Sequence, residues 1–464
     1  MSRNLVRVAA CAAALGVPAG ALADPETDAL RAQLAQTRAD YEARIAALEA
    51  RLERLEARDA AVRAAGANGA LPGPAPLASG AAPALGNAFN PAISLILDGK
   101  YAAYSQSPEA YALPGFQLGG EAGLAREGFG VGESELIASA NADPYFYGQL
   151  TAAVHQDEGE TEFELEEAFF DTLALPAGFT LRGGRFFSGV GYLNSRHAHT
   201  WDFADATLPQ RAFLGNNFFD DGLQLRYLAP TPFLLELGAE VLRGDSFPAA
   251  GADDSGSGAR SAFVHAGWDL GASHSLRVGA SRLWADARGR SGGGHAHGHD
   301  DEDGHVAEFS GNSDLTILDL VWKWAPDGNS RERNASLVAE FYDRDEDGLV
   351  TLEEGGMTEF SAYRGEQRGW SVHGTYQFRP RWRAGLRHDR LWTDNRGSDA
   401  DVLTEAGLAD GDDPRRWSAM LEWNPSEFSR LRVQYNRDHS TGTLDHQWLL
   451  QYVLSLGAHG AHTW

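Results

Sequence analysis

The chain has 464 residues, with 65 Asp and Glu against 39 Lys and Arg, which gives a formal net charge of −26 at pH 7. Such an acidic chain repels a phosphate backbone, so nucleic acid is excluded as a partner. No stretch approaches the roughly 20 consecutive apolar residues of a helical membrane span, whereas a transmembrane β-barrel remains allowed.

The amino-terminal residues have the pattern of a secretory signal peptide. Arg3 and Arg7 precede a short apolar run over residues 8–17, and Ala21-Leu22-Ala23 supplies a small-x-small cleavage site. We therefore expect a signal peptide over residues 1–23, export from the cytoplasm, and a mature chain without cysteine, because Cys11 lies in the leader. A lipoprotein signal ending at Cys11 is the alternative, but its apolar core would be too short.

Residues 24–65 are rich in Ala, Arg, Glu and Leu and contain no Gly. Large side chains recur at seven-residue intervals, with a second core position four residues after two of them: Leu34, Tyr41, Leu48, Leu55 and Val62, then Ile45 and Leu52. This spacing predicts a periplasmic coiled coil over 24–65 that associates with other copies. The alternative is a single helix that packs on the periplasmic mouth of the barrel predicted for the rest of the chain. Residues 66–89, rich in Ala, Gly and Pro, are predicted to be a linker.

From residue 90 to residue 464, short runs of alternating apolar and polar residues are separated by turn residues. The pattern predicts an all-β transmembrane barrel of about sixteen antiparallel strands. The last run is the clearest, because one face carries a series of large side chains: His446, Trp448, Leu450, Tyr452, Leu454 and Leu456. It continues to a terminal aromatic, Trp464, which we expect the barrel-assembly machinery to recognise. An edge strand of a soluble sandwich is the alternative.

The connections between the predicted strands alternate in length, as those of an outer-membrane barrel do. Short turns such as Arg379-Pro380-Arg381 are predicted on the periplasmic side. Long extracellular loops are predicted near residues 105–130, 193–220, 244–259, 287–312, 344–367 and 394–414. Both ends of the barrel would then lie in the periplasm.

On these features the chain resembles the trimeric outer-membrane porins of Gram-negative bacteria. The closest resemblance is to the phosphate-selective-porin-like group, in which a periplasmic coiled coil precedes the barrel. It rests on the leader, the seven-residue repeat, segments such as Gly369–Trp382, and the end of the chain over Ser455–His462. The chain is also similar to a proteobacterial subfamily associated with zinc. TonB-dependent receptors fit poorly, because there is no room for a plug domain and about twenty-two strands.

The resemblance implies that the long connection after the fifth strand folds into the lumen and narrows it. Residues of this loop and of one lumen face are therefore the candidate pore constriction: His197, His199, Asp202, Asp205, Arg381, Arg383 and Arg387. Glu162, Glu164 and Glu166 share a face of another strand, and opposed charge rows would create a transverse field that selects solutes. The alternative is a set of ordinary lumen-facing polar residues, and His197 and His199 could either make hydrogen bonds or ligate a metal.

One predicted extracellular loop is rich in metal-ligating side chains. Imidazoles and carboxylates alternate on a glycine-rich segment, and the candidate ligands are His295, His297, His299, Asp300, Asp301, Asp303 and His305. These ligand types suit Zn²⁺, so we expect a zinc site of modest affinity on a flexible loop. The alternative is a solvated acidic loop with incidental histidines.

A second segment matches the calcium-loop template at its ligand positions, with Gly348 at the position of the sharp turn. The candidate ligands are Asp343, Asp345, Asp347, Thr351 and Glu354. The flanking sequence predicts strands rather than the paired helices of that motif. Asp347-Gly348 is therefore equally consistent with a hairpin turn.

The sequence as a whole predicts an outer-membrane porin that forms a passive channel for small solutes, with a His-rich extracellular loop that is expected to capture zinc or other divalent cations for uptake. The expected partners are two further copies of the chain in a homotrimer, outer-membrane lipid and lipopolysaccharide, the assembly machinery, and small solutes or metal ions. No catalytic residue and no required cofactor are predicted, with Zn²⁺ and Ca²⁺ as optional ligands. The alternatives are a plugged surface metal-binding protein and a barrel hydrolase.

Overall fold

The computed structural model describes residues 91–457, except 120–121, 158–159, 251–255, 292–305 and 355. The predicted signal peptide, coiled coil and linker lie outside the described residues, as does Trp464, so these remain predictions. Backbone contacts separate residues 1–83 from residues 84–464, and all the described elements belong to the second unit. None of the helices in the described part of the chain is long and apolar enough to cross a membrane.

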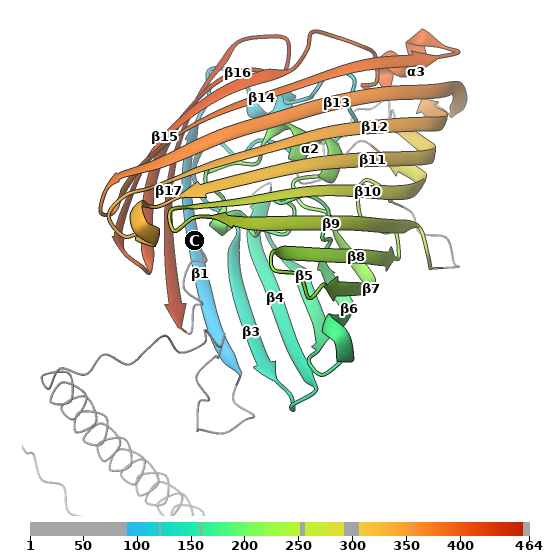
Figure 1. Cartoon of the computed structure of the whole chain (residues 1–464). Helices are drawn as coiled ribbons and strands as arrows, with labels where there is room; N and C mark the ends of the chain where they lie inside the picture. The colour runs from blue at the N-terminus through green and yellow to red at the C-terminus, as the bar shows by residue number, and fades with distance from the viewer. Residues whose placement is uncertain are drawn as a thin grey trace, which may run out of the picture. The chain divides into compact units, whose positions relative to one another are not determined.

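The described residues form one antiparallel sheet that closes into a barrel (Figure 1). Closure occurs where β17 (Asp445–Gly457) pairs with β1 (Ala92–Ala103), in a register that sets Ser94 opposite Gly457 and Ala103 opposite Trp448. The short strand β2 (Gly128–Val131) pairs with one half of β1, and β3 (Ser134–Asn141) pairs with the other half. Together β2 and β3 occupy one place in the wall, so the barrel has sixteen places and the predicted strand number is confirmed.

All the other strands pair with their neighbours in chain order, which is the up-and-down topology of a barrel without crossovers. They are β4 (Phe146–Asp157), β5 (Glu160–Thr172), β6 (Phe179–Phe187), β7 (Phe219–Leu228), β8 (Leu234–Leu242), β9 (Ala259–Leu270), β10 (His274–Ser291), β11 (Val306–Trp324), β12 (Asn334–Glu354), β13 (Met357–Arg379), β14 (Trp382–Gly397), β15 (Arg415–Ser426) and β16 (Ser429–His439).

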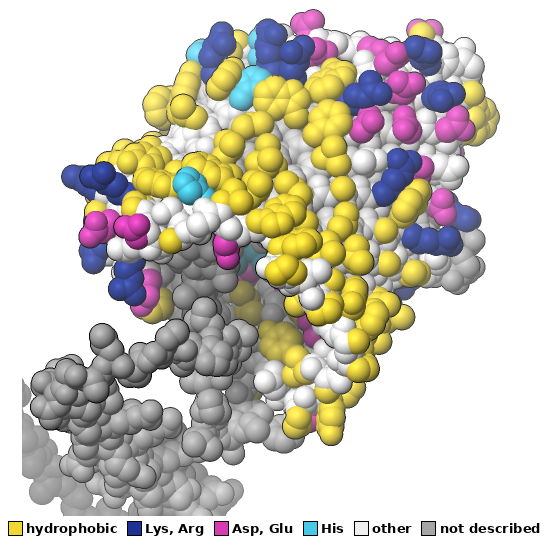
Figure 2. Space-filling view, viewed as in Figure 1, with side chains coloured by type: hydrophobic (Ala, Val, Ile, Leu, Met, Phe, Trp, Pro, Cys, Tyr) yellow, Lys and Arg dark blue, Asp and Glu magenta, His cyan; other side chains and the backbone are white. Residues whose placement is uncertain are grey.

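The outer face of the barrel is apolar because successive side chains of a strand point to opposite faces. In β17 the residues Trp448, Leu450 and Tyr452 are exposed, whereas Gln447 and Gln451 are buried towards the lumen. Figure 2 shows the hydrophobic side chains over the outer face, with the charged side chains gathered towards its two ends. This distribution is the one that a lipid-facing band requires.

The wall is much taller on one side than on the other. Strands β10 to β13 contain 18, 19, 21 and 23 residues, against 9 in β6 and in β8. A strand of 23 residues tilted by about 40° rises on the order of 55 Å, well beyond an apolar band of about 25 Å. The predicted long loop over 344–367 is therefore wrong, because this segment is a hairpin with only two residues between Glu354 and Met357. The predicted loop over 287–312 is too long at both ends, since residues 287–291 belong to β10 and residues 306–312 to β11, while residues 292–305 lie outside the described ones.

The segment that matches the calcium-loop template lies in β12. It is extended throughout and pairs with β13, with Asp343 opposite Arg368 and Gly348 opposite Tyr363. Asp345 and Asp347 are exposed on the outer side, and Glu346 between them is buried in the lumen. The predicted loop with a turn at Gly348 is therefore wrong, because that loop must wrap its ligands around one point.

An apolar core fills part of the lumen. The connection between β1 and β2 (residues 104–127) and the connection between β6 and β7 (residues 188–218) both fold inwards and pack on each other. Phe116 meets Phe213 edge to face with ring centroids 5.6 Å apart, and Phe213 stacks on Tyr342 of β12 at 5.4 Å. We call residues 188–218 the pore loop. Its inward fold agrees with the expectation. The connection 104–127 falls within the extracellular loop predicted near residues 105–130, and the sequence did not predict that it packs inside the lumen.

The pore loop contains a 3-10 turn at Ala198–Thr200 and one short α-helix, α2 (Leu208–Leu214), all of whose residues are buried. The helix begins at a capping box between Thr207 and Gln210 and ends at Gly215, which has a φ of 63°. Figure 1 shows α2 inside the barrel, where it lies against β12, β13 and β14. Complete burial of Leu208 and Phe213 stabilises this position by about 1.5–3 kcal/mol for each side chain.

Candidate functional site

The pore loop is attached to the barrel wall by ion pairs, beginning at Asp202. This carboxylate lies 2.8 Å from Arg383 Nη1 of β14 and 3.2 Å from His373 Nε2 of β13. Burial acts to raise the pKa of Asp202, but Arg383 and His373 outweigh it and hold the pKa well below its usual range. Asp202 is therefore ionised at any ordinary pH.

Asp205 makes the second attachment. Its carboxylate oxygens lie 2.6 Å from Arg387 of β14 and 2.9 Å from Arg416 of β15, and they also accept hydrogen bonds from Gln434 and Asn436 of β16. Burial acts to raise the pKa of Asp205, but the arginines outweigh it and lower the pKa far below its usual range. The predicted carboxylates of the loop thus contact the arginines of the wall directly.

The neighbouring residues continue the same network along the wall. Arg383 also pairs with Glu422 of β15 at 3.2 Å, and Glu422 pairs with Arg432 of β16 at 2.6 Å. Arg432 in turn donates to the carbonyl oxygen of Trp201 in the pore loop at 2.9 Å. The lumen faces of β14, β15 and β16 therefore form a basic arc, which we define by Arg383, Arg387, Arg416 and Arg432.

The other side of the pore loop meets an acidic arc on β3 and β5, defined by Glu135, Glu166 and Glu167. His197 Nδ1 lies 3.3 Å from Glu166 and 3.4 Å from Glu135, and His197 Nε2 lies 3.0 Å from Glu167. His199 Nδ1 lies 2.5 Å from Glu135. Burial acts to lower the pKa of His197, but the three carboxylates outweigh it and raise the pKa well above its usual range.

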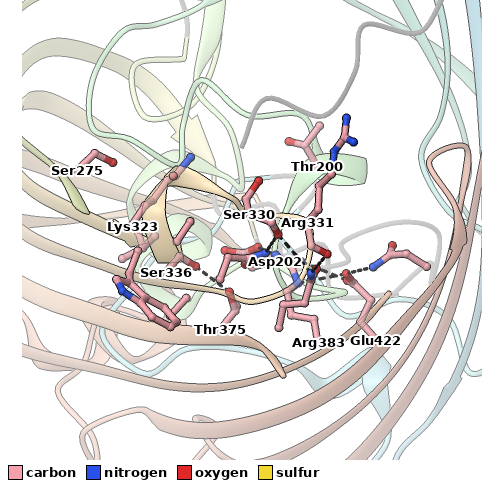
Figure 3. Close-up of a pocket in the computed structure, with 18 of the residues that line it drawn as sticks. Thr200, Asp202, Ser275, Lys323, Ser330, Arg331, Ser336, Thr375, Arg383 and Glu422 are labelled. Atoms are coloured by element: carbon pink, nitrogen blue, oxygen red, sulfur yellow. Dashed lines mark hydrogen bonds and ion pairs between the residues drawn. The ribbon is translucent and has the colours of Figure 1, made fainter. Parts of the chain in front are cut away.

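A cavity of about 1590 Å³ lies beside the pore loop and reaches the turns predicted to be periplasmic, such as residues 271–273. We call it the vestibule. Its charged lining is predominantly basic, with Arg196, Arg277, Lys323, Arg331, Arg381, Arg383 and Arg430 against Asp202, Asp269, Glu422 and Glu427. Figure 3 shows Asp202 directed towards Arg383, with Glu422 beside that guanidinium and Lys323 across the cavity.

A second cavity, of about 460 Å³, is lined by different residues of the pore loop, including Trp201 and Asp205. Its other lining residues include Lys100 of β1, Glu164 of β5 and Arg126 of the inward connection 104–127, together with residues of β2 and β17. The pore loop therefore contributes to the lining of both cavities.

Apart from the calcium-template residues of β12, the sequence-predicted site residues fall into three groups. The pore loop brings His197, His199, Asp202 and Asp205 against the wall, with Arg383 and Arg387 among their partners. Arg381 lies outside this group, since it occupies the turn before β14 with a φ of 70° and lines the vestibule. The candidate zinc ligands at 295–305 lie outside the described residues.

Several residues of the network were missed by the sequence analysis. Arg416, Glu422 and Arg432 occupy inward positions of strands that were predicted correctly, and Glu135 and Glu167 do so on the acidic arc. The sequence signal that could have identified them was a series of charged residues at alternate positions of these strands, on the face opposite the apolar one. The helix α2 was also missed, although Thr207-x-x-Gln210 and Gly215 are capping signals.

Solved structures similar to this chain include several outer-membrane proteins. OmpF of Salmonella typhi matches with a TM-score of 0.48 and 12% identity, covering 78% of this chain and 97% of that one. OprB of Pseudomonas putida matches with a TM-score of 0.47 and 15% identity, covering 79% and 94%. The outer-membrane channel DcaP of Acinetobacter baumannii has a TM-score of 0.45 and 13% identity, covering 79% and 96%.

No family model matches the chain. An uncharacterised protein of Aquifex aeolicus (strain VF5) is 30% identical over 403 residues, which cover 81% of this chain and 80% of that protein. The similarity thus covers most of both chains. This chain therefore belongs to the same protein family as the Aquifex aeolicus protein.

Proposed function

We propose that this protein forms a passive channel for small solutes in the outer membrane of a Gram-negative bacterium. The observation that carries the proposal is a closed barrel with an apolar outer face and a charged vestibule of about 1590 Å³ beside an inward loop. An apolar exterior is stable in lipid, and charged side chains in the interior are stable when they are ion-paired or in contact with water. The pore loop would form the constriction between the two cavities.

The charge of the vestibule supports a preference for anions on the periplasmic side. Seven Lys and Arg line it against four Asp and Glu, although the whole chain has a formal net charge of −26. A cavity with low-dielectric walls focuses the field of its lining charges, so the local excess outweighs the distant acidic surface. At 0.1 M salt, charges more than about 10 Å away are largely screened. A solute in the vestibule is therefore influenced more by the lining charges than by the distant acidic surface.

The first experiment is planar-bilayer conductance of the refolded mature protein. We expect discrete current steps, and in a KCl gradient a reversal potential that indicates more permeant chloride than potassium. The double variant Arg331→Gln, Arg381→Gln should shift the reversal potential towards cations, because both side chains line the vestibule. Arg396→Gln is the matched control, since Arg396 is highly exposed and pairs with Asp394 outside the lumen. Absence of current steps would overturn the channel proposal.

A plugged barrel that binds ligands at the surface is the second candidate function. The apolar core formed by residues 104–127 and the pore loop favours it, because this core occupies lumen that an open pore would need. In the bilayer experiment such a protein would insert without conducting. A barrel hydrolase is less well supported, because the charged groups around the pore loop are ion-paired to the wall rather than arranged around a nucleophile.

The proposal includes a homotrimer, which the predicted coiled coil over 24–65 would reinforce. We expect the mature protein to migrate as a heat-labile trimer. Deletion of residues 24–65 should weaken the trimer without abolishing it, because barrel-to-barrel contacts would remain. A stable monomer in mild detergent, measured by native mass spectrometry, would contradict this assembly.

Zinc capture by the loop over 292–305 is the finer part of the proposed function. It is supported by four histidines and adjacent carboxylates on a connection predicted to be extracellular. Replacement of His295, His297, His299 and His305 by alanine should remove the surface-bound Zn²⁺ detected by calorimetry and leave conductance unchanged. If zinc-limited growth is also unchanged, the loop holds metal without serving uptake.

A further inference from the structure

The pore loop and the acidic arc create a second cluster of metal-ligating atoms, remote in sequence from the loop over 292–305. One nitrogen of His197 and one oxygen each of Glu135 and Glu166 lie within 4.8 Å of one another, and the two carboxylates are buried. The three residues come from the pore loop, β3 and β5. We propose that Glu135, Glu166 and His197 bind a divalent transition-metal ion that ties the pore loop to the barrel wall.

The two distances from His197 to the carboxylates fit a coordination sphere. His197 Nδ1 is 3.3 Å from Glu166 Oε2 and 3.4 Å from Glu135 Oε2. Zinc binds nitrogen and oxygen at about 2.0–2.2 Å, so two ligands of a tetrahedral ion are roughly 3.3–3.5 Å apart. An N–H···O hydrogen bond is most often about 2.9 Å long, and a single N–H is poorly placed to serve two carboxylates.

The surroundings of the cluster provide a second and independent observation. Glu167 lies 3.0 Å from His197 Nε2, the nitrogen on the far side of the ring, and the ring of His199 lies 2.5 Å from the other oxygen of Glu135. A metal-binding histidine usually donates its second N–H to a carboxylate, and a ligating carboxylate is usually hydrogen-bonded in turn. The outer partners that orient both ligands are therefore already in position.

The charge of the cluster points to a cation as well. Glu135, Glu166 and Glu167 are 0%, 4% and 5% exposed, so water screens them little. Both nitrogens of His197 face carboxylates, and even an imidazolium that donates from both would bring only one positive charge to three carboxylates. A divalent ion at Nδ1, with Nε2–H donating to Glu167, would satisfy all three carboxylates at once. Burying like charges together without a compensating cation is costly.

The chemistry of the ligands narrows the choice of ion. One imidazole nitrogen and two carboxylate oxygens suit Zn²⁺ or Mn²⁺, whereas Ca²⁺ takes six to eight oxygen ligands. His197 also lines the vestibule, so an ion could enter from the water there and keep a water molecule as its fourth ligand. Binding would hold the pore loop against β3 and β5 and so limit its movement.

The test uses the full mature protein with His295, His297, His299 and His305 replaced by alanine, which removes the surface loop as a source of signal. Calorimetry and elemental analysis with Zn²⁺ as the probe should find one ion per chain. The variants Glu166→Gln and His197→Ala, made in this background, should each bind Zn²⁺ at least about tenfold more weakly. His265→Asn is the matched control and should bind as the background does, because His265 lies 3.1 Å from Glu236 on another part of the wall.

A second measurement keeps the proposal testable if a variant fails to fold. X-ray absorption at the zinc edge of the folded background protein should report one imidazole and otherwise oxygen ligands at about 2.0–2.2 Å. The proposal is overturned if the background protein binds no stoichiometric Zn²⁺, if Glu166→Gln and His197→Ala bind as tightly as it does, or if two or more imidazoles surround the ion. Conductance plays no part in these outcomes, so the channel proposal stands or falls separately.

Discussion

Asp205 makes more contacts with the wall than its sequence context suggests. It is a short side chain in an irregular loop, yet it meets two arginines and two side-chain amides from three neighbouring strands. A buried charge of this kind is stable only while its partners remain, because removing one side leaves the other unpaired. The pore loop is thus held in place by a few residues whose loss should have large effects.

Replacement of Asp205 by alanine should destabilise the protein by about 3–5 kcal/mol, because the buried Arg387 and Arg416 would be left to share one carboxylate, that of Asp389. The pore loop should also lose its attachment to the basic arc, and we expect larger and noisier single-channel currents. Thermal unfolding in detergent and bilayer recording measure the two effects. Asp343→Ala is the control. It breaks an exposed pair with Arg368 and should cost no more than about 1 kcal/mol.

Asp202 gives a prediction about pH. Its pKa in the folded protein lies well below the ordinary value of about 3.9, so its attachment contributes stability that is complete above about pH 5. This contribution is lost as the pH falls below about 4, towards the lowered pKa. The groups that face Asp202 are Arg383, His373 and Arg432.

The comparison that isolates this contribution is the difference in melting temperature between the wild type and Asp202→Asn. We expect a constant difference from pH 8 to pH 5 that shrinks below about pH 4. A difference that grows on acidification would show that the carboxylate does not hold the loop through its charge.

At the level of elements, the success of sequence analysis depends on what each face of a strand meets. In β17 one face meets lipid and the other a polar lumen, so the apolar and polar residues alternate and the strand is predicted correctly. Over residues 343–347 of β12 both faces are polar, as in Asp343, Arg344 and Asp345, and the alternation carries no hydrophobic signal. The sequence therefore predicts a loop there.

The contacts inside the lumen depend on register and could not be predicted from the pattern. The sequence predicts that Asp205 faces basic residues. The folded chain brings Arg416 to it from more than 200 residues away, a contact that the pattern does not predict. The same holds for Glu135 and His197, which are 62 positions apart in the chain and meet through the fold. The sequence shows which side chains are polar. Which of them become partners is decided by the strand register and by the closure of the barrel.

The helix α2 provides a prediction at this scale. Phe213 is fully buried between Phe116 and Tyr342, so Phe213→Ala should cost about 3–5 kcal/mol and loosen the apolar core in the lumen. The strands would keep their pairing, so the barrel should remain heat-modifiable while its conductance rises. Phe360→Ala is the control, because Phe360 is 56% exposed and should leave both properties nearly unchanged. Unaltered conductance in Phe213→Ala would mean that this core does not limit the pore.

At the scale of the whole molecule, closure depends on the pairing between β1 and β17. The terminal aromatic that follows β17 in the sequence is predicted to direct assembly, and deletion of Trp464 should lower the amount of folded protein in the outer membrane. Membrane fractionation with a heat-modifiability assay measures this, and Trp448→Phe serves as a control that retains an aromatic on the exposed face of β17. Equal outer-membrane levels after the deletion would count against this role.

The attachment of the pore loop has a mechanical consequence. The loop is bonded to Glu166 on β5 through His197 and to His373 on β13 through Asp202. Seven of the sixteen wall positions lie between these strands in each direction, so the two bonds join opposite sides of the ring. A ring braced across its diameter resists being squeezed into an ellipse. Lateral pressure from lipid or from neighbouring copies should therefore deform this barrel less than one whose loop is tied to a single side.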